Sequence, residues 1–413
     1  MAIIKVQKGT KDILPQDMGV WHLMERNAEE IFSRYGAKEI RTPIFEATEL
    51  FARGVGDTTD IVNKEMYTFE KSERSLTLRP ENTAGVVRSF IENGMHRLSA
   101  PVKLWYKGPM FRYERPQAGR QRQFHQVGIE VFGIKQASCD AEVILMAVNY
   151  LKSLGLNDLS VELNSLGCPE CREVFKTKLK AVLKPYLSQL CPDCQARYEK
   201  NPLRLLDCKV EECKEIYAKP EIQEVIQSDY ICKECSDHFE ELKGYLDELN
   251  INYSINKLLV RGLDYYNRTV FEIKSNNLGS QNAVCGGGRY DSLVRNLGGE
   301  DTPAVGFAMG MERLASLIGE KPEEKTEVFI VSNSSKDAIK LAEEVRAKNI
   351  SCEMDLTNKK FVKQLEKASK TAKYALILGE DEIDAGTVTV KNLETSEQKS
   401  VKRDEVYSLL SAR

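Results

Sequence analysis

The stretch FRYERPQAGRQRQFHQVGIE, residues 111–130, decides the fold class of this chain. Its two ends alternate polar with aromatic or β-branched residues, which is the period-2 pattern of strands, and an arginine-rich loop connects them. The alternation places one set of polar and aromatic side chains on a shared face of the hairpin: Arg112, Glu114, Phe124, Gln126 and Glu130. Guanidinium groups suit phosphate, so this face is a candidate binding surface, although a solvated basic hairpin has the same composition.

Further strand patterns surround this hairpin and predict a sheet. The runs EIRTPIFEATEL, EMYTFE, SLTLRP and VKLWYKGPMFRYE are rich in β-branched and aromatic residues, and similar runs return later in KLLVRGLDYYNRTVFEIKS and QNAVCGGGRYDSL. An amphipathic helix is expected over residues 21–35. Period-2 alternation with long connections predicts an antiparallel sheet with helices on one face, which is an α+β fold.

Two parts of the chain depart from this pattern. Residues from about 165 to 250 are rich in Lys, Glu and Cys and predict short helices, so we interpret them as an inserted module. A charged linker, GEKPEEKTE, spans residues 319–327. Beyond it, strand patterns alternate with helical ones, which predicts a small α/β domain with a largely parallel core.

Length and composition exclude several classes of protein. The chain has 413 residues, of which 42% are hydrophobic, and its 59 basic and 62 acidic side chains give a net charge of −3. This length allows two to four domains with buried cores, and the composition argues against a largely disordered chain. No apolar run reaches the roughly 18 residues of a membrane span. The N-terminus lacks a signal-peptide pattern, so we expect a cytoplasmic protein in a reducing compartment.

Three later stretches also carry candidate binding residues. LVRGLDYYNRTVFE, residues 259–272, places Arg261, Tyr265 and Tyr266 at a turn, although a tyrosine-rich edge with a structural salt bridge is an alternative. CGGGRYDSL (285–293) and AVGFAMGMERL (304–314) are glycine-rich strands, which suggests close approach of backbone to a ligand or tight packing of sheet against helix. Neither run is a dinucleotide or P-loop fingerprint.

Together and in this order, the stretches resemble one family over essentially the full chain. The chain is similar to class II aminoacyl-tRNA synthetases, and specifically to histidyl-tRNA synthetases. The matching stretches are KGTKDILP (8–15), IRTPIFE (40–46, with Pro43), TLRPENTAG (77–85), FRYERPQAGRQRQFHQ (111–126), LVRGLDYYNRTVFE (259–272), GGGRYDSL (286–293) and GFAMGMERL (306–314). The chain departs at Asn82, where the family commonly has glycine, but retains Glu81 and Thr83.

This resemblance implies a fold and an activity. It implies a catalytic domain over residues 1–320, interrupted by a helical cysteine-rich insert at 168–250, and an anticodon-binding α/β domain over residues 325–413. The catalytic sheet would be antiparallel and flanked by helices, and the chain would form a homodimer. The implied enzyme is a ligase that activates L-histidine with ATP and Mg²⁺ and transfers it to the 3′ end of tRNA(His).

The resemblance also implies residue roles. The implied catalytic residues are Arg112, Arg261 and Arg313. The implied ATP-binding residues are Arg112, Glu114, Arg120, Phe124, Arg261 and Arg313. The implied histidine-binding residues are Glu81, Thr83, Gln126, Glu130, Tyr265, Tyr266 and Tyr290. Fixed cations stabilise charge in a nucleotidyl-transfer transition state, and a carboxylate opposite a phenol can contact both nitrogens of an imidazole. No residue is assigned to a catalytic metal.

The cysteines of the insert are not explained by the resemblance. CPEC (168–171), CPDC (191–194) and CKEC (232–235) form three C-x-x-C pairs, namely Cys168/Cys171, Cys191/Cys194 and Cys232/Cys235. The first and second pairs fit a four-cysteine zinc spacing, and pairing the second with the third would close the insert. Free thiols on helices are the alternative, so the sequence leaves structural zinc open.

Two other functions compete with this interpretation. A synthetase-like regulatory subunit of histidine biosynthesis would have lost aminoacylation, and we expect it to lack the C-terminal domain and to degrade the arginine motifs. A pure nucleic-acid-binding protein with a zinc module would leave the candidate histidine and ATP motifs unexplained. Histidine-dependent exchange of pyrophosphate into ATP separates the enzyme from both.

Overall fold

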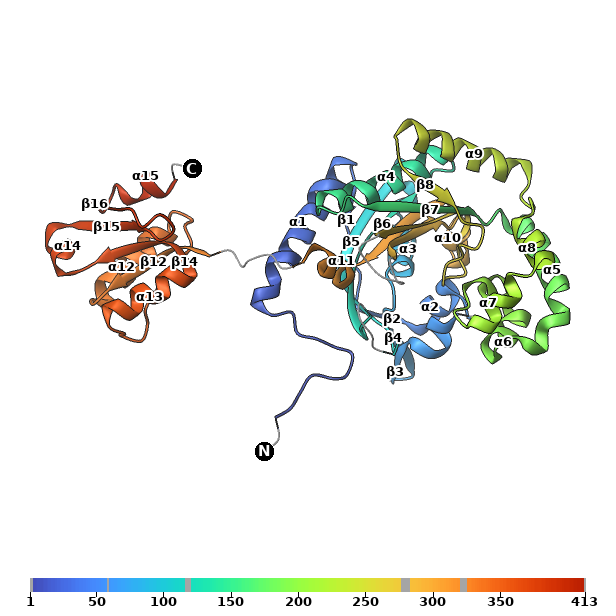
Figure 1. Ribbon diagram of the computed structural model, residues 1–413, viewed down its shortest axis with the longest axis horizontal. Helices are drawn as coiled ribbons and strands as arrows, with labels where there is room; N and C mark the ends of the chain where they lie inside the picture. The colour runs from blue at the N-terminus through green and yellow to red at the C-terminus, as the bar shows by residue number, and fades with distance from the viewer. Residues whose placement is uncertain (1–2, 58, 116–119, 276–282, 320–324, 412–413) are drawn as a thin grey trace. The chain divides into compact units, whose positions relative to one another are not determined.

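The computed structural model describes residues 3–411 except 58, 116–119, 276–282 and 320–324. Part of the arginine-rich loop and most of the expected linker therefore lie outside the described residues. The chain divides into two compact units, Met1–Lys321 and Pro322–Arg413 (Figure 1). Each unit is described by itself below.

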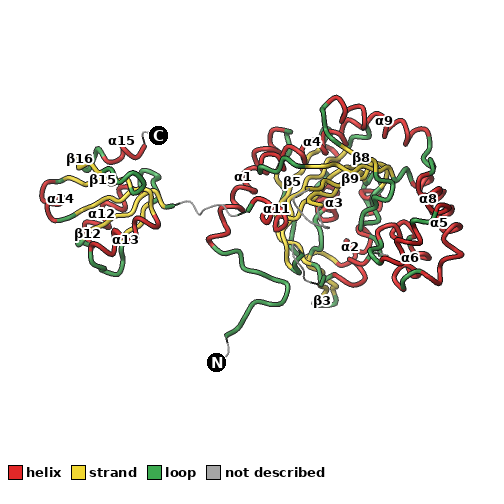
Figure 2. Tube along the Cα trace, in the orientation of Figure 1, coloured by secondary structure: helices red, strands yellow, loops and turns green. Residues whose placement is uncertain are grey.

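The first unit is built on an eight-stranded sheet in the order β1-β5-β6-β11-β10-β9-β7-β8. The pairs β1–β5 and β7–β8 at the two edges are parallel, and the pairs between them are antiparallel. The prediction of an antiparallel sheet is therefore confirmed. Figure 2 shows the strands of this sheet side by side, with helices around them. The strands are β1 (Lys38–Glu39), β5 (Val102–Phe111), β6 (Gln123–Phe132), β7 (Leu159–Ser165), β8 (Tyr253–Ile255), β9 (Asn267–Ser275), β10 (Ala283–Arg289) and β11 (Ala304–Gly310).

Helices cover both faces of this sheet, whereas the sequence predicted them on one. The first face packs against four helices: α1 (Met18–Arg34), α4 (Ala137–Ser153), α9 (Lys233–Glu248) and α11 (Met311–Ile318). On β6, Val127, Ile129 and Val131 point into that core. The second face receives the short helices α3 (Thr83–Glu92) and α10 (Leu293–Asn296), because both carry apolar side chains that need burial.

A small second sheet, in the order β2-β4-β3, lies in the same unit. Its strands are β2 (Phe45–Ala47), β3 (Tyr67–Lys71) and β4 (Arg74–Leu78). The expected strand EIRTPIFEATEL ends early, because α2 (Thr48–Val55) begins within it and buries Leu50, Phe51 and Val55 at helical spacing. The expected strand at KLLVRGLDYY is likewise irregular backbone until β9 begins at Asn267.

The insert leaves the sheet after β7 and returns through α9. Its further helices are α5 (Pro169–Leu183), α6 (Pro192–Lys200), α7 (Glu211–Tyr217) and α8 (Pro220–Gln227), in agreement with the expected short helices. Figure 1 shows these four gathered together, and they share a small apolar core that includes Phe175, Leu205 and Ile222. The insert therefore folds around a core of its own.

The second unit is a five-stranded sheet in the order β13-β12-β14-β15-β16. The first three strands are parallel and the last two join antiparallel, so the expected parallel core is present. The strands are β12 (Thr326–Ser332), β13 (Cys352–Met354), β14 (Ala372–Leu378), β15 (Thr387–Asn392) and β16 (Gln398–Lys402). The helices are α12 (Ser335–Arg346), α13 (Phe361–Thr371), α14 (Glu380–Ala385) and α15 (Val406–Ser411). Across the described residues of both units, no helix combines the length and apolar character that a membrane crossing needs.

A buried ion pair fixes the end of β10 against the helices behind the sheet. Arg289 is fully buried, and its Nε donates to Asp140 Oδ1 of α4 at 3.0 Å. Asp140 also pairs with His238 of α9 at 2.6 Å. Although burial alone would raise the pKa of Asp140, the guanidinium of Arg289 holds that pKa below its usual value. This network fixes the backbone immediately before Tyr290.

Candidate active site

A cluster of buried polar side chains surrounds Glu130 on the second face of the sheet. Glu130 lies on β6 and is 1% exposed. Its Oε1 accepts from the Thr83 hydroxyl at 2.8 Å and the Tyr106 hydroxyl at 3.3 Å, and its Oε2 accepts from the hydroxyl of Tyr290. Thr83 begins α3, Tyr106 is on β5 and Tyr290 follows β10, so four elements meet at one carboxyl group. We call these four residues the Glu130 cluster.

Burial changes the protonation of both carboxyl groups in this region. It raises the pKa of Glu130 to about 8, and the hydrogen bonds from Tyr290 and Thr83 offset this only in part. Glu81 accepts from the backbone N–H groups of Thr83 at 2.7 Å and Ala84 at 3.0 Å. Burial nevertheless raises the pKa of Glu81 as well. Burial therefore shifts both carboxyl groups toward their protonated forms.

Two further tyrosines, Tyr265 and Tyr266, lie beside the cluster. The ring of Tyr265 lies 4.6 Å from that of Tyr266 and 5.5 Å from that of Tyr290, between ring centroids. The hydroxyl of Tyr265 and Oε1 of Gln126 are buried, and neither has a hydrogen-bond partner among the described residues. An unpaired buried polar atom is costly, so these two atoms suit a polar ligand.

Glycines make room for these side chains. A Cβ on Gly306 of β11 would lie 2.0 Å from Oε2 of Glu130, and one on Gly128 of β6 would lie 2.5 Å from the Tyr106 hydroxyl. Any larger residue at Gly306 or Gly128 would collide with a polar side chain of the cluster. Both glycines therefore serve the site itself, in addition to any packing of sheet against helix. The glycine-rich pattern of β11 thus has a local physical cause in the site itself.

Arginines form the neighbouring half of the site. Nε of Arg112 donates to the Pro80 carbonyl at 2.8 Å, which ties it to the segment that carries Glu81. The guanidinium of Arg112 lies 5.3 Å from the ring centroid of Phe124. Nη1 of Arg120 lies 3.3 Å from Oε2 of Glu114. The alternation expected for this hairpin is confirmed, because its other face contributes Val127 and Ile129 to the opposite core.

Arg261 joins the two halves. Its Nη1 lies 2.6 Å from Oε1 of Glu272 on β9, and a Cβ on Gly286 of β10 would lie 1.8 Å from its Nη2. Arg313 at the start of α11 donates to the Ala283 carbonyl. Burial and the neighbouring Arg120 guanidinium lower the pKa of Arg313. Two guanidinium groups that repel each other form a natural binding site for an anion.

The structure thus gathers the predicted residues in one region, in which a series of contacts extends from Glu81 to Arg313. Sequence reasoning missed Tyr106 and Glu272. Tyr106 shares its strand face with Met110, so alternation along β5 was a usable signal. Glu272 is the last residue of the stretch 259–272, and its partner Arg261 lies eleven residues earlier. Strand alternation could not predict this pair, because the backbone before β9 is irregular. Asn82, the residue that departs from the family, is accommodated by the Thr42 hydroxyl, which donates to its Oδ1 at 2.6 Å.

Comparison with known proteins agrees with this geometry. The family model described as histidyl-tRNA synthetase matches residues 9–175 and 201–314, and the model described as anticodon binding domain matches residues 325–413. The chain is 49% identical to the histidine–tRNA ligase of Acetivibrio thermocellus, with 99% of each chain covered. It is 47% identical to that of Desulforamulus reducens, with 98% of each covered. The chain belongs to the histidyl-tRNA synthetase family.

A solved structure supports the same assignment. The apo histidyl-tRNA synthetase of S. aureus is 36% identical to this chain, with a TM-score of 0.82 over 99% of this chain and 100% of that one. The chain therefore carries the catalytic domain of a ligase family whose members use ATP and a divalent metal ion. The matches do not favour the regulatory-subunit alternative.

Proposed function

We propose that this chain activates L-histidine with ATP and transfers the histidyl group to the 3′ end of tRNA(His). One observation carries the proposal: the buried Glu130 cluster, which suits an imidazole, adjoins a group of arginines that suits a triphosphate. Arg261 lies between them, next to Glu272 and Tyr266. A site that binds histidine on one side and ATP on the other can place the carboxylate of histidine next to the α-phosphorus of ATP.

The histidine side of this proposal rests on complementary hydrogen bonding. Glu130 and Tyr266 would bind the two ring nitrogens, and Tyr265 and Tyr290 would form the walls. Glu81, Thr83 and Gln126 would bind the ammonium group, which is supported by the unpaired buried Oε1 of Gln126. A site whose polar groups stay unpaired without the correct ligand rejects isosteres strongly.

The ATP side rests on the arginines. Arg112 would contact the α-phosphate, Arg120 the terminal phosphates, and Glu114 the adenine amino group. Arg313 would lie either on the adenine face opposite Phe124 or near the terminal phosphates. The adenine would stack on Phe124, whose ring already lies beside the Arg112 guanidinium. We propose Arg112, Arg261 and Arg313 as the catalytic residues, because fixed positive charge stabilises the transition state without reorganisation.

The reaction would run in two steps. A carboxylate oxygen of histidine attacks the α-phosphorus, the bond to the bridging oxygen breaks, and pyrophosphate leaves. The terminal adenosine hydroxyl of the tRNA then takes the acyl group and AMP leaves. The divalent ion of this family would be Mg²⁺, which lowers the charge of the triphosphate. In the described part of the chain, groups of three or more metal ligands consist of cysteines, so Mg²⁺ would be held mainly by the phosphate oxygens.

Four broader features belong to the same proposal. Residues 1–320 would be the catalytic domain, with residues 168–250 as the insert. Residues 325–413 would bind the anticodon of tRNA(His), which is supported by the match to an anticodon-binding model. A homodimer in the cytoplasm would be the working form, by analogy with the family.

The test is exchange of pyrophosphate into ATP by the purified protein, measured with each of the twenty amino acids. We expect exchange with histidine alone. Glu130→Ala should weaken the binding of histidine far more than the binding of ATP. Exchange with another amino acid, or none while the folded protein binds ATP, would overturn the proposal.

A further inference from the structure

Eight cysteines of the insert gather into two groups of four. The first group is Cys168, Cys171, Cys232 and Cys235, and the second is Cys191, Cys194, Cys208 and Cys213. In each group, all four Sγ atoms lie within 4.8 Å of one another. We propose that each group binds one structural Zn²⁺ ion, and we call them the base site and the tip site. Neither pairing considered from the sequence is correct, because Cys191/Cys194 pairs with Cys208 and Cys213 instead.

The sulfur positions fit a single tetrahedral ion. Four thiolates at the usual Zn–S length of about 2.3 Å have sulfurs about 3.8 Å apart. The Sγ atoms of Cys168 and Cys171 are 3.5 Å apart, and those of Cys191 and Cys208 are 3.9 Å apart. A disulfide would need a separation of about 2.05 Å. A four-iron cluster would hold its cysteine sulfurs farther apart than these groups do.

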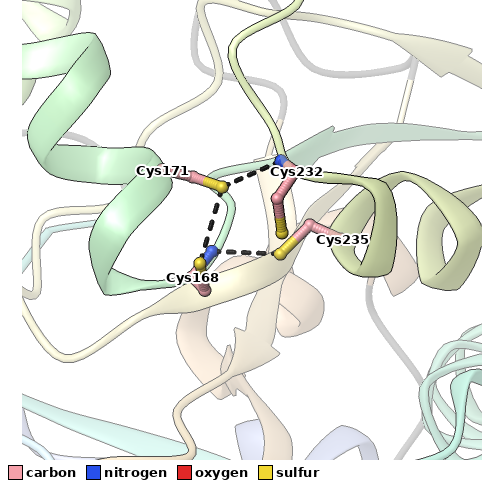
Figure 3. Close-up of side chains that lie close together, drawn as sticks. All are labelled: Cys168, Cys171, Cys232 and Cys235. Carbon is pink, nitrogen blue, oxygen red and sulfur yellow. Dashed lines mark hydrogen bonds between the residues drawn. The ribbon is translucent and has the colours of Figure 1, made fainter.

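Backbone donors already point at the sulfurs of the base site (Figure 3). The N–H of Cys168 donates to Sγ of Cys235 at 3.2 Å, and the N–H of Cys232 donates to Sγ of Cys171 at 3.0 Å. Cys168 and Cys232 are the residues that precede the first turns of α5 and α9. Peptide N–H groups at helix starts stabilise negative charge, so this arrangement favours thiolates.

The tip site repeats the arrangement. The N–H of Cys191, which precedes α6, donates to Sγ of Cys213 at 3.2 Å. The Tyr217 hydroxyl donates to Sγ of Cys194 at 3.3 Å. Such second-layer donors orient and stabilise metal-bound sulfur. Two independent groups with the same construction are difficult to attribute to chance packing of small hydrophobic residues.

The charges around each proposed site are also compatible with zinc binding. Four thiols release four protons when they bind Zn²⁺, so each site carries a net charge of −2. The Arg268 guanidinium lies near Cys235 and the Arg197 guanidinium near Cys194, so positive charge adjoins each negatively charged site.

The sites explain how a small insert holds its shape. The base site joins the first residues of α5 to the first residues of α9, so it closes the insert where it leaves and re-enters the catalytic part. The tip site joins α6 to α7, which flank the small core around Leu205. Small cores commonly need a metal or disulfides to be stable. In a reducing compartment thiols do not form lasting disulfides, so cysteines there stabilise a core by binding a metal. The family model leaves residues 176–200 unmatched, and Cys191 and Cys194 lie in that gap.

The first test is metal content of the full-length protein, purified with zinc in the medium and then dialysed against a mild chelator. We expect two zinc ions per chain. Cys232→Ser and Cys191→Ser should each retain one ion, and the double variant none. Serine suits the position before a helix, so these variants remove a ligand without removing the helix start. Cys352→Ser, in the other unit, is the matched control and should retain two.

A second measurement does not depend on variants. Replacement of zinc by Co²⁺ in the wild-type chain should give the intense visible bands of tetrahedral thiolate coordination, with an amplitude that saturates at two ions per chain. Iron in place of zinc, fewer than eleven titratable thiols in the denatured metal-free protein, or failure of the reduced chain to take up either ion would overturn the proposal. If the wild-type chain held one zinc ion and only one of the two single variants lost it, the assignment of the other site would be overturned.

Discussion

At the scale of single residues, the site is organised by buried charge. Arg261 combines three features: an acidic partner at 2.6 Å, a glycine beneath its guanidinium, and the neighbouring tyrosines Tyr265 and Tyr266. Its position is fixed before any substrate binds. That preorganisation is the property expected of a group that stabilises a transition state.

Substitution of Arg261 should therefore separate binding from chemistry. Arg261→His should leave the affinities for ATP and histidine within about tenfold and slow adenylate formation by roughly 10²–10³-fold, because a fixed charge at the reacting phosphate is lost. Single-turnover formation of histidyl-adenylate measures this effect. Arg295→Ala, an exposed arginine of α10, should behave as wild type. Unchanged turnover in Arg261→His would remove Arg261 from the chemistry.

The raised pKa of Glu130 predicts a pH dependence of histidine binding. Below pH about 8 the free site holds a proton on Glu130, and in the complex that proton is shared with the imidazole, whose own pKa is near 6.5. Above pH 8 the free site has lost the proton, so binding must take one up. Histidine affinity should then fall about tenfold per pH unit above 8. Calorimetric titration should show this slope disappear in Glu130→Gln; an identical slope in that variant would contradict the assignment.

At the scale of elements, the insert contacts the candidate active site directly. Arg172, one residue after Cys171 on α5, donates from Nη1 to the Tyr266 carbonyl at 2.9 Å and from Nη2 to the Asp264 carbonyl at 3.5 Å. The backbone N–H of Arg268 donates to the carbonyl of Gly167, immediately before the base site. The start of α5 therefore holds the irregular segment that presents Tyr265 and Tyr266.

Loss of the contact between Arg172 and this segment should weaken the binding of histidine selectively. Hydrogen bonds to a charged donor contribute about 1.5–3 kcal/mol, so Arg172→Ala should raise the KM for histidine roughly tenfold or more while the KM for ATP changes less than about threefold. Steady-state exchange kinetics measure both constants. Arg172→Lys should restore part of the affinity, and Lys176→Ala, one turn further along α5, is the control. Equal changes in both KM values would mean that Arg172 acts only through general stability.

At the scale of the whole molecule, the two compact units have separate cores. A chain that lacks the second unit therefore retains all residues of the first unit's central core. A chain ending at residue 321 should keep histidine-dependent pyrophosphate exchange within about threefold of wild type and lose most tRNA charging, because anticodon contacts would be absent. Filter-bound aminoacylation measures the second effect. Intact charging by the shortened chain would contradict the proposed role of residues 325–413.

The sequence by itself determined the features that depend on local pattern. Alternation in residues 111–130 placed Phe124, Gln126 and Glu130 on one face, because side chains of a strand alternate regardless of what lies around it. The strand and helix order of residues 325–413 was readable for the same reason. The motif resemblance identified the family from residues that the structure then gathered into one region.

Only the tertiary structure decided which distant residues meet. Linear spacing suggested that Cys191/Cys194 joins one of the other C-x-x-C pairs, but the folded insert brings Cys208 and Cys213 to it and brings Cys168 and Cys232 together from opposite ends of the insert. Tyr106, Glu272 and Arg172 were likewise missed as partners of the site. Their contacts follow from strand order and from the path of an irregular loop, and these are set by burial of the whole core rather than by any local pattern.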